Sequence, residues 1–250
     1  MSRLNFRMAV ALFALGVLAL SATVCTEVRA QAVDPAATQI LKQMTDYLGS
    51  LQKFSVHTQN TVEDVLETGH RVDFEISANV VISRPNKLQA ERKGDVIDQI
   101  FYYDGKTLTL YNPSDKVYAT EPAPGTIEEM LDFARESLGL TVPVADLVYR
   151  NAFPLLMHDV TLAVVVGKAV IGGVKCNHLL FSRPGVDFQV WVAEGGQPLP
   201  HKYVVTDTAT PARVSITTVM SGWNVAPAVA DARFTFAAPQ GAKRITFMPL

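Results

Sequence analysis

Hydrophobic residues recur at every second position from residue 72 to residue 82. The apolar positions are Val72, Phe74, Ile76, Ala78, Val80 and Ile82, and the polar residues between them include Asp73, Glu75, Ser77 and Asn79. A period of two places successive side chains on opposite faces of a β-strand, so one face is apolar and the other is wet. This strand spans about 11 residues, whereas strands usually have about five or six. Its length favours a large curved sheet over a compact sandwich.

A second pattern, from residue 98 to residue 120, predicts a β-meander. Three short runs of aromatic and β-branched residues are separated by Asp104-Gly105 and by the Asn-Pro-Ser-Asp sequence at 112–115, both of which favour turns. Further predicted strands are 54–67, 88–92, 161–171, 174–182, 186–193, 200–206, 213–222 and 233–236. Because short turns join consecutive strands, we expect a mainly β fold with some α: a large curved antiparallel sheet, or incomplete barrel, of about ten to eleven strands.

Helical periodicity appears in two places. Apolar residues recur at three- and four-residue spacing after the Asp34-Pro35 cap, which predicts an N-terminal helix ending near residues 49–52. Thr126 and Glu129 form a capping box that begins a second helix, which stops at Gly139. A shorter helical piece is predicted at 144–149, and apolar residues continue at 153–157. We expect the middle section to form a helical lid over the apolar face of the sheet.

The first 30 residues predict a secretory signal peptide. Arg3 and Arg7 precede an apolar run at 8–22, and small or medium residues follow at 28–30. The run is too short to cross a bilayer, so we expect cleavage after Ala30 or Ala32 and no transmembrane helix in the mature chain. The predicted organisation is a signal peptide at 1–30 and a single domain at 31–250, located in the periplasm. Cys25 leaves lipidation open, although the bulky Val24 before it is atypical of lipoprotein sites.

Composition and motifs reduce the number of functional classes that the sequence fits. The formal net charge is −2 and no basic stripe is present, so nucleic acid is not an expected partner. Cys176 would be the only cysteine of the mature chain, which excludes an internal disulfide. The five histidines lack paired ligand spacing, and there is no nucleophile elbow or phosphate loop. We therefore expect no metal, no cofactor and no enzymatic activity; a histidine beside a serine in a pocket would revive a hydrolase.

The apolar residues of the long strands and of the lid are the candidate ligand site. A curved sheet with a helical cover can enclose an unfilled cavity, which is the usual way in which apolar ligands are held. Strand parity alone leaves the inward direction of each side chain open. The candidate lining residues are Phe74, Ile76, Val80, Phe101, Tyr103, Leu108, Leu110, Met130, Leu131, Val190 and Trp191.

Three longer segments carry a family resemblance. They are FYYDGKTLTLYNPSDKVYATEPAPGTIEEML, DFQVWVAEGGQPLPHKYVVT and RFTFAAPQGAKRI. Together they resemble an uncharacterised family of predicted bacterial periplasmic proteins and, more remotely, the outer-membrane lipoprotein carrier and receptor superfamily. That resemblance implies an incomplete antiparallel barrel around a helical lid, with an interior that holds acyl chains. Tyr103, Asp104, Gly105, Gly196 and Pro198 match the pattern as fold positions, whereas the carrier's polar ligand-holding residues have no match.

Two functions follow as hypotheses. The first is a periplasmic, non-enzymatic carrier or receptor for a lipid, a lipoprotein acyl chain or another amphiphile. The alternative is an envelope protein-interaction or sensory module that uses the same fold with a closed core. Trp191 or Trp223 on the outer face would suit that alternative, because exposed apolar patches recruit partners.

Overall fold

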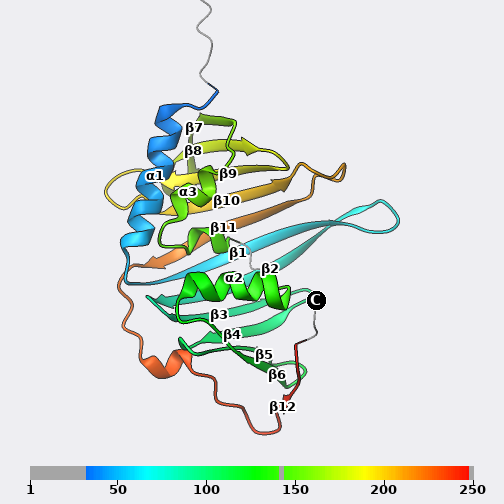
Figure 1. Ribbon diagram of the computed structural model, residues 1–250. Coiled ribbons are helices and arrows are strands. Elements are labelled where there is room, and N and C mark those ends of the chain that lie inside the picture. Colours follow the sequence, from blue (N-terminus) through cyan, green and yellow to red (C-terminus); the bar gives the residue numbers. More distant parts are fainter. Residues whose placement is uncertain (1–31, 141–143, 248–250) are drawn as a thin grey trace, which may run out of the picture. The chain divides into compact units, whose positions relative to one another are not determined.

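A single open sheet organises the part of the chain that the computed structural model describes, residues 32–140 and 144–247 (Figure 1). Twelve strands occur in these residues, in the order β12-β6-β5-β4-β3-β2-β1-β11-β10-β9-β8-β7, and β12 and β7 form the two edges. All pairs are antiparallel except β12 with β6. The predicted fold class is confirmed: the protein is mainly β, and its sheet does not close into a barrel. The predicted signal peptide and Cys25 lie outside the described residues.

The strands agree with the predicted ones apart from the last. They are β1 (Lys53–Val65), β2 (Arg71–Ser83), β3 (Lys87–Gly94), β4 (Asp98–Tyr103), β5 (Thr107–Asn112), β6 (Val117–Pro122), β7 (Leu162–Ile171), β8 (Val174–Arg183), β9 (Val186–Ala193), β10 (Pro200–Asp207), β11 (Ser215–Asn224) and β12 (Lys243–Arg244). The helical elements are α1 (Pro35–Ser50), α2 (Ile127–Leu138), α3 (Ala152–Met157) and the 3₁₀ turns η1 (Ala145–Leu147) and η2 (Asp231–Phe234). None of these helices has the length and apolar character needed to span a bilayer.

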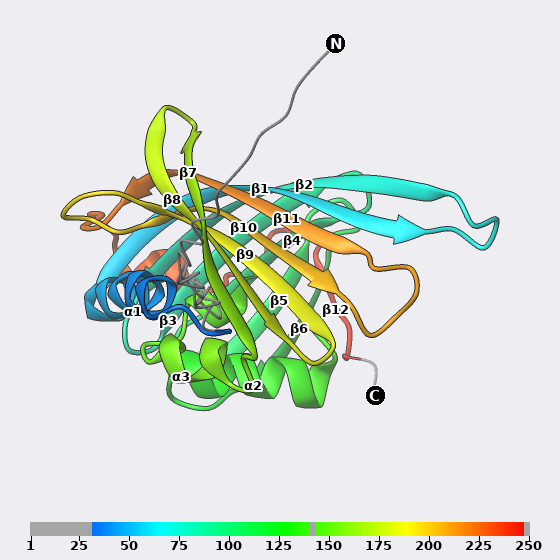
Figure 2. The ribbon, with the colours of Figure 1, turned by 90° about the horizontal axis from the view of Figure 1, so that it is seen from above.

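The hairpin of β1 and β2 is the centre of the sheet. Each strand has 13 residues, and they pair in unbroken register from Lys53 opposite Ser83 to Val65 opposite Arg71. The other side of β1 pairs with β11, so the hairpin joins the strands that precede the lid to those that follow it. Its far end projects beyond the neighbouring strands (Figure 2).

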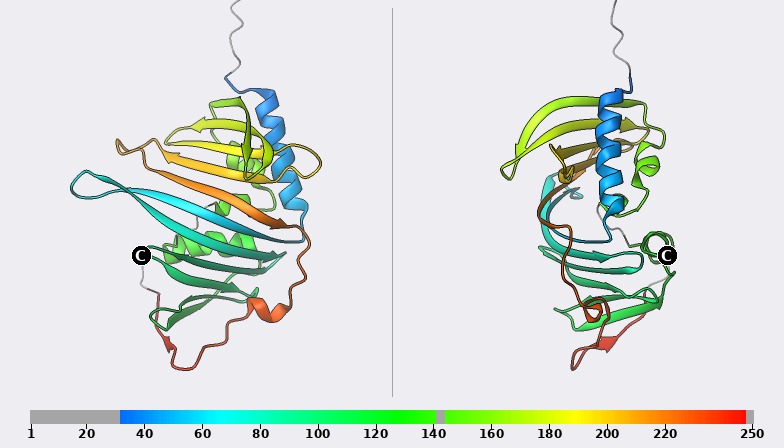
Figure 3. Two further views of the ribbon diagram at one scale, coloured as in Figure 1. Left: turned by 180° about the vertical axis from the view of Figure 1, so that it is seen from behind. Right: turned by 90° about the vertical axis from the view of Figure 1, so that its left-hand side faces the viewer.

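Helix α1 covers one half of the concave face. The Asp34 side chain accepts a hydrogen bond of 2.8 Å from the Ala36 amide, which caps the helix as the sequence predicts. The buried stripe of the helix packs against inward side chains of β7 to β10. This core includes Ala37, Leu41, Met44, Leu48, Ala163, Leu179, Phe181, Phe188, Val190, Val192 and Tyr203. Figure 3 shows α1 running across these strands.

Helix α2 covers the other half. Its apolar stripe packs against inward side chains of β3, β4 and β5, as expected for a lid. This second core includes Leu88, Ala90, Phe101, Tyr103, Leu108, Ile127, Met130, Leu131 and Ala134. Gly139 ends the helix in the left-handed conformation, with φ of 63°, and the Leu140 amide donates to the Ala134 carbonyl at 2.9 Å. The sequence therefore predicts correctly both the apolar face of this helix and its C-terminal end at Gly139.

The predicted strand at 233–236 is wrong. Residues 231–234 form the turn η2, and the following chain crosses the convex face of the sheet (Figures 1 and 3). Phe236 packs against Tyr102, Tyr111 and Tyr118, with ring centroids 5.4, 5.4 and 4.9 Å apart. The alternating Phe-Thr-Phe pattern looks like a strand, but its phenylalanines fit between side chains instead of pairing their backbone. Between residues 235 and 247, the chain pairs with the sheet only at β12.

We expect Phe236→Ala to lower the free energy of unfolding by about 1 to 2 kcal/mol, because a half-buried phenyl ring and three aromatic contacts are lost. Urea unfolding followed by circular dichroism measures the change. Thr235→Ala, at the exposed neighbouring position, is the control and should stay within about 0.5 kcal/mol of the parent. Equal stability of Phe236→Ala and the parent would show that the C-terminal segment does not brace the sheet.

Candidate ligand cavity

An apolar cavity of about 90 Å³ lies where the two covers of the sheet meet. Four half-buried residues pack against both cores: Leu51, Val80, Tyr149 and Trp223. We call the region around these four residues the seam. The cavity is lined by Leu48, Phe54, Val56, Thr58, Val80, Leu88, Ala90, Arg92, Phe101, Leu108, Met130, Leu131, Ala134, Val144, Ala145, Leu147, Val148, Met220 and Trp223. A smaller pocket of about 50 Å³ shares part of this lining and extends along β1, β2 and β3.

Five of the candidate lining residues face the cavity: Val80, Phe101, Leu108, Met130 and Leu131. Ile76 faces the adjoining smaller pocket. They come from β2, β4, β5 and α2, which the fold brings together across more than 50 residues of sequence. The structure thus gathers six of the eleven candidates at one place.

Val190 and Trp191 lie on opposite faces of β9, as neighbours on a strand must. Val190 is buried under α1, away from the cavity. Trp191 is on the convex face, where it stacks on His178 with ring centroids 4.0 Å apart and packs near Cys176. The placement of Trp191 in the interior is therefore corrected, because the register of β9 turns it outward.

Phe74, Leu110 and Tyr103 lie outside the cavity for different reasons. Pairing of β2 with β3 ends at Ile76, so Phe74 lies on the projecting part of the hairpin and is half-buried. Leu110 packs at the margin of the α2 core. Tyr103 is fully buried in that core and anchors the lid.

Sequence reasoning missed the lining residues of β1, β11 and η1. Phe54 and Val56 follow the same period of two as the candidate residues of β2, so alternation along β1 is a signal that identifies them. Trp223 lies just beyond the predicted end of its strand; its ring packs against Phe54 at 5.9 Å, and its Nε1 donates to the Pro200 carbonyl at 3.0 Å. Because Trp223 lines the cavity, it does not belong to the outer face.

A buried polar network lies beside the apolar lining. Asn60 Nδ2 donates to Thr58 Oγ1 and to the Ile76 carbonyl, both at 2.9 Å, and Thr218 Oγ1 donates to Asn60 Oδ1 at 2.7 Å. The Asn60 amide is therefore fully satisfied, which makes its burial tolerable. Arg92 also reaches the cavity, and its guanidinium lies 5.8 Å from the centroid of the Phe101 ring. Burial lowers the pKa of Arg92.

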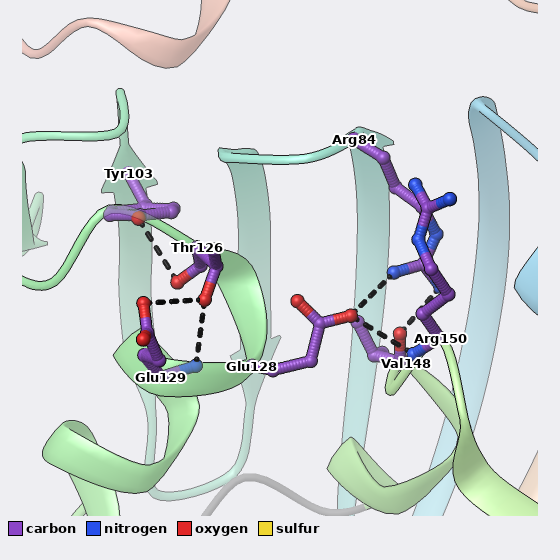
Figure 4. Close-up of polar contacts among 7 residues, drawn as sticks. All are labelled: Arg84, Tyr103, Thr126, Glu128, Glu129, Val148 and Arg150. Atoms are coloured by element: carbon purple, nitrogen blue, oxygen red, sulfur yellow. Dashed lines mark hydrogen bonds and ion pairs between the residues drawn. The ribbon is translucent and has the colours of Figure 1, made fainter.

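The lid is anchored at its N-terminal end by a buried arginine (Figure 4). Arg84, whose side chain is 1% exposed, follows directly after β2 and places Nη1 at 3.1 Å from Glu128 Oε1 on α2. Its Nη2 donates to the Val148 carbonyl at 2.5 Å, while the Arg150 amide donates to the same Glu128 oxygen at 3.0 Å. Burial lowers the pKa of Arg84 and Glu128 opposes that shift. This group of contacts fastens α2 and the η1 segment to the end of one strand.

Tyr103 supplies a second anchor beside the first (Figure 4). Its hydroxyl donates toward the carbonyl oxygens of Pro124 and Thr126, the latter at 3.1 Å. Burial raises the pKa of Tyr103 to about 12, so the hydroxyl keeps its proton at neutral pH. Thr126 Oγ1 accepts from the Glu129 amide at 3.2 Å and donates to the Glu129 carboxylate at 2.8 Å. The predicted Thr126 cap is thus present and begins the lid helix at a fixed point, whereas Glu129 accepts from the Thr126 hydroxyl and not from the Thr126 backbone amide as a full capping box would require.

Reactive groups are sparse around the cavity. Within residues 32–140 and 144–247, no group of three His, Cys, Asp or Glu side chains is arranged to hold a metal ion. Cys176 is buried on the convex face, and burial raises the pKa of its thiol. The lining of the larger cavity is mainly apolar, with Thr58 and Arg92 among its polar side chains.

An open antiparallel sheet with two helical covers and an apolar cavity between them defines the class of this protein. Residues 37–248 match the model of the family described as predicted periplasmic protein DUF2092, and the chain belongs to that family. No curated protein sequence matches the chain.

Several solved structures are similar to this chain at low sequence identity. An uncharacterized conserved protein from Thermus thermophilus is 11% identical, with 84% of this chain and 99% of that chain covered and a TM-score of 0.50. The lipoprotein LppX of Mycobacterium tuberculosis is 16% identical over 79% and 100% of the two chains, with a TM-score of 0.45. A LolA superfamily protein from Nitrosomonas europaea is 12% identical over 80% and 97%, with a TM-score of 0.41. The similarity to the Thermus protein supports the fold alone.

The Arg84–Glu128 contact can be measured with a double-mutant cycle. We expect Arg84→Met to lower the free energy of unfolding by about 2 to 3 kcal/mol, because Glu128 and the Val148 carbonyl lose their donor; the 28% exposure of Glu128 keeps the loss below that of a fully buried pair. Glu128→Gln and the double variant complete the cycle, measured by urea unfolding. The coupling energy should be about 1 to 2 kcal/mol. A value near zero would mean that the ion pair does not fasten the lid.

Proposed function

We propose that the protein is a periplasmic, non-enzymatic binding protein for an amphiphile, whose acyl chain enters the cavity at the seam. The observation that supports this most directly is the apolar lining beneath a cover that is anchored at one end. Burial of an acyl chain there would contribute roughly 0.8 kcal/mol per methylene. Membership of a family described as predicted periplasmic fits a role in the envelope.

The cavity is smaller than an acyl ligand requires. Its volume of about 90 Å³ compares with about 300 to 1,000 Å³ for typical ligand sites, so only a few methylenes fit without rearrangement. We infer that α2 moves outward when the ligand enters, pivoting on the Arg84 and Tyr103 anchors. Met130 projects from α2 into the cavity, and its unbranched side chain can repack around a chain of variable shape. The binding-competent state is then an opened form of the same fold.

The first experiment is native mass spectrometry of the protein purified from its own envelope, together with titration of an apolar fluorescent probe. We expect a co-purifying lipid, or probe uptake in its absence. Ala134→Leu places a larger side chain in the cavity and should weaken probe binding by about 10- to 100-fold, since two or three methylene contacts are displaced. Ser137→Leu, on the exposed side of the same helix, is the matched control. An apo mass without probe uptake, or equal probe binding by both variants and the parent, would refute the proposal.

A second candidate function, recruitment of an envelope protein, is favoured by the open edge of β7. Val166 and Val170 on this strand are 54% and 64% exposed, and in the described parts of the chain only the single bridge from Val33 pairs with the outer edge. An exposed apolar edge can accept a strand from a partner. A β-bulge between Val165 and Gly167 and the charge of Lys168 limit such pairing.

A photo-crosslinking residue at position 170 tests this candidate in intact cells. If a partner strand adds to β7, we expect one discrete adduct from position 170 and none from exposed position 67 in the projecting hairpin. Absence of an adduct, or the same adducts from both positions, would exclude the edge of β7 as a recruitment site.

A further inference from the structure

Three residues form a row across the floor of the smaller pocket. Thr58 on β1 pairs with Ala78 on β2, and Ala78 pairs with Arg92 on β3, so the three side chains share the concave face. Adjacent strands are about 4.8 Å apart, which places Thr58 and Arg92 about 10 Å apart at their Cα atoms. Between them, Ala78 presents only a methyl group. The row is therefore a gap with a polar side chain on each side.

Both polar groups have hydrogen-bonding capacity to spare. Within residues 32–140 and 144–247, no carboxylate lies at ion-pair distance from Arg92, and its guanidinium forms no hydrogen bond. Its only specific contact there is the ring of Phe101. Thr58 is 4% exposed and accepts from Asn60, but none of the same residues accepts the proton of its hydroxyl. A charged donor thus lies at the polar end of an apolar cavity, with no acceptor for it in the described parts of the chain.

We propose that Arg92, assisted by the Thr58 hydroxyl, binds the anionic head group of the amphiphile whose chain occupies the cavity. This inference rests on the proposed function and specifies its ligand class: a long-chain amphiphile that carries a carboxylate, sulfate or phosphate. A planar guanidinium can hold two oxygens of such a group at once. The same Arg92 lines both the larger cavity and the smaller pocket, so head group and chain would lie in continuous space.

A purely structural role for Arg92 makes a different prediction. Its methylene stem covers apolar surface beside Phe101, and arginine commonly packs in this way while its charge reaches solvent. In that case the charge would have no influence on which ligand binds. The two roles therefore differ in ligand selectivity and not in affinity alone.

The test compares dodecanoate with 1-dodecanol, which share a chain length and differ in head-group charge, by displacement of the apolar probe at pH 8. We expect the parent protein to prefer dodecanoate. Arg92→Gln should weaken dodecanoate binding about 10- to 100-fold and change 1-dodecanol binding less than about threefold, because one charge-assisted pair is lost. Arg92→Lys should recover part of the preference. Lys93→Gln, which removes the same charge from the adjacent exposed position, should leave both affinities unchanged.

The outcomes separate this inference from the proposed function. Equal weakening of both ligands by Arg92→Gln, or a parent protein that binds 1-dodecanol as well as dodecanoate, overturns the head-group assignment and leaves the cavity's role intact. Failure of the parent to bind either ligand overturns the proposed function and the assignment with it. The melting temperature of unliganded Arg92→Gln should stay close to that of the parent, since among the described residues the guanidinium loses only its contact with the Phe101 ring; a marked decrease would support the structural role instead.

Discussion

The concave face of the sheet has to be covered by elements other than strands, because the sheet ends at β12 and β7 and does not close on itself. A closed barrel fills its interior with its own side chains, whereas an open curved sheet leaves an apolar surface that water would wet. Helix α1 covers the β7 to β10 half and α2 covers the β3 to β5 half. Two covers over one continuous face must meet along a line. The cavity lies at that meeting, so it follows from the architecture.

The lid differs from α1 in how it is held. Helix α1 buries a full apolar stripe, and a backbone pair between Asp34 and Ala163 ties its start to β7. The start of α2 combines the buried Ile127 with polar contacts: a buried guanidinium, a tyrosine hydroxyl and a capping threonine (Figure 4). Polar contacts depend strictly on distance and angle, while an unbranched apolar side chain such as methionine can adapt its packing to a changed neighbour. The N-terminal end of α2 is thus held by directional bonds, while methionine and leucine side chains pack along the rest of the helix.

The sequence predicted most of this fold because its patterns are local. Alternation along β2, the Asp104-Gly105 turn and the capping pair of α2 each depend on residues close in sequence. The prediction for the C-terminal segment is wrong because the position of Phe236 is set by its contacts with three tyrosines on β4, β5 and β6. These tyrosines are far from Phe236 in sequence, so no local pattern reveals the contacts. A lining residue was predictable where the alternation of side chains along its strand and the pairing of that strand with its neighbours give the same inward direction, as at Val80 on β2. The direction was not predictable for Trp191, where it is outward and is set by pairing with β8 and β10.

The small size of several lining residues at the seam indicates that the sequence itself leaves this cavity unfilled. Alanine lies at 90 on β3, at 134 on α2 and at 145 in η1, all facing the larger cavity, and Ala78 lies under the smaller pocket. Leucine or isoleucine at these positions would fill the space and gain the packing that a closed core needs. Large side chains occupy the flanks instead, at Phe54, Phe101 and Trp223. Small residues at the centre and large residues around them leave an unfilled space between α2 and the sheet. Arg92 lines both the larger cavity and the smaller pocket that make up this space.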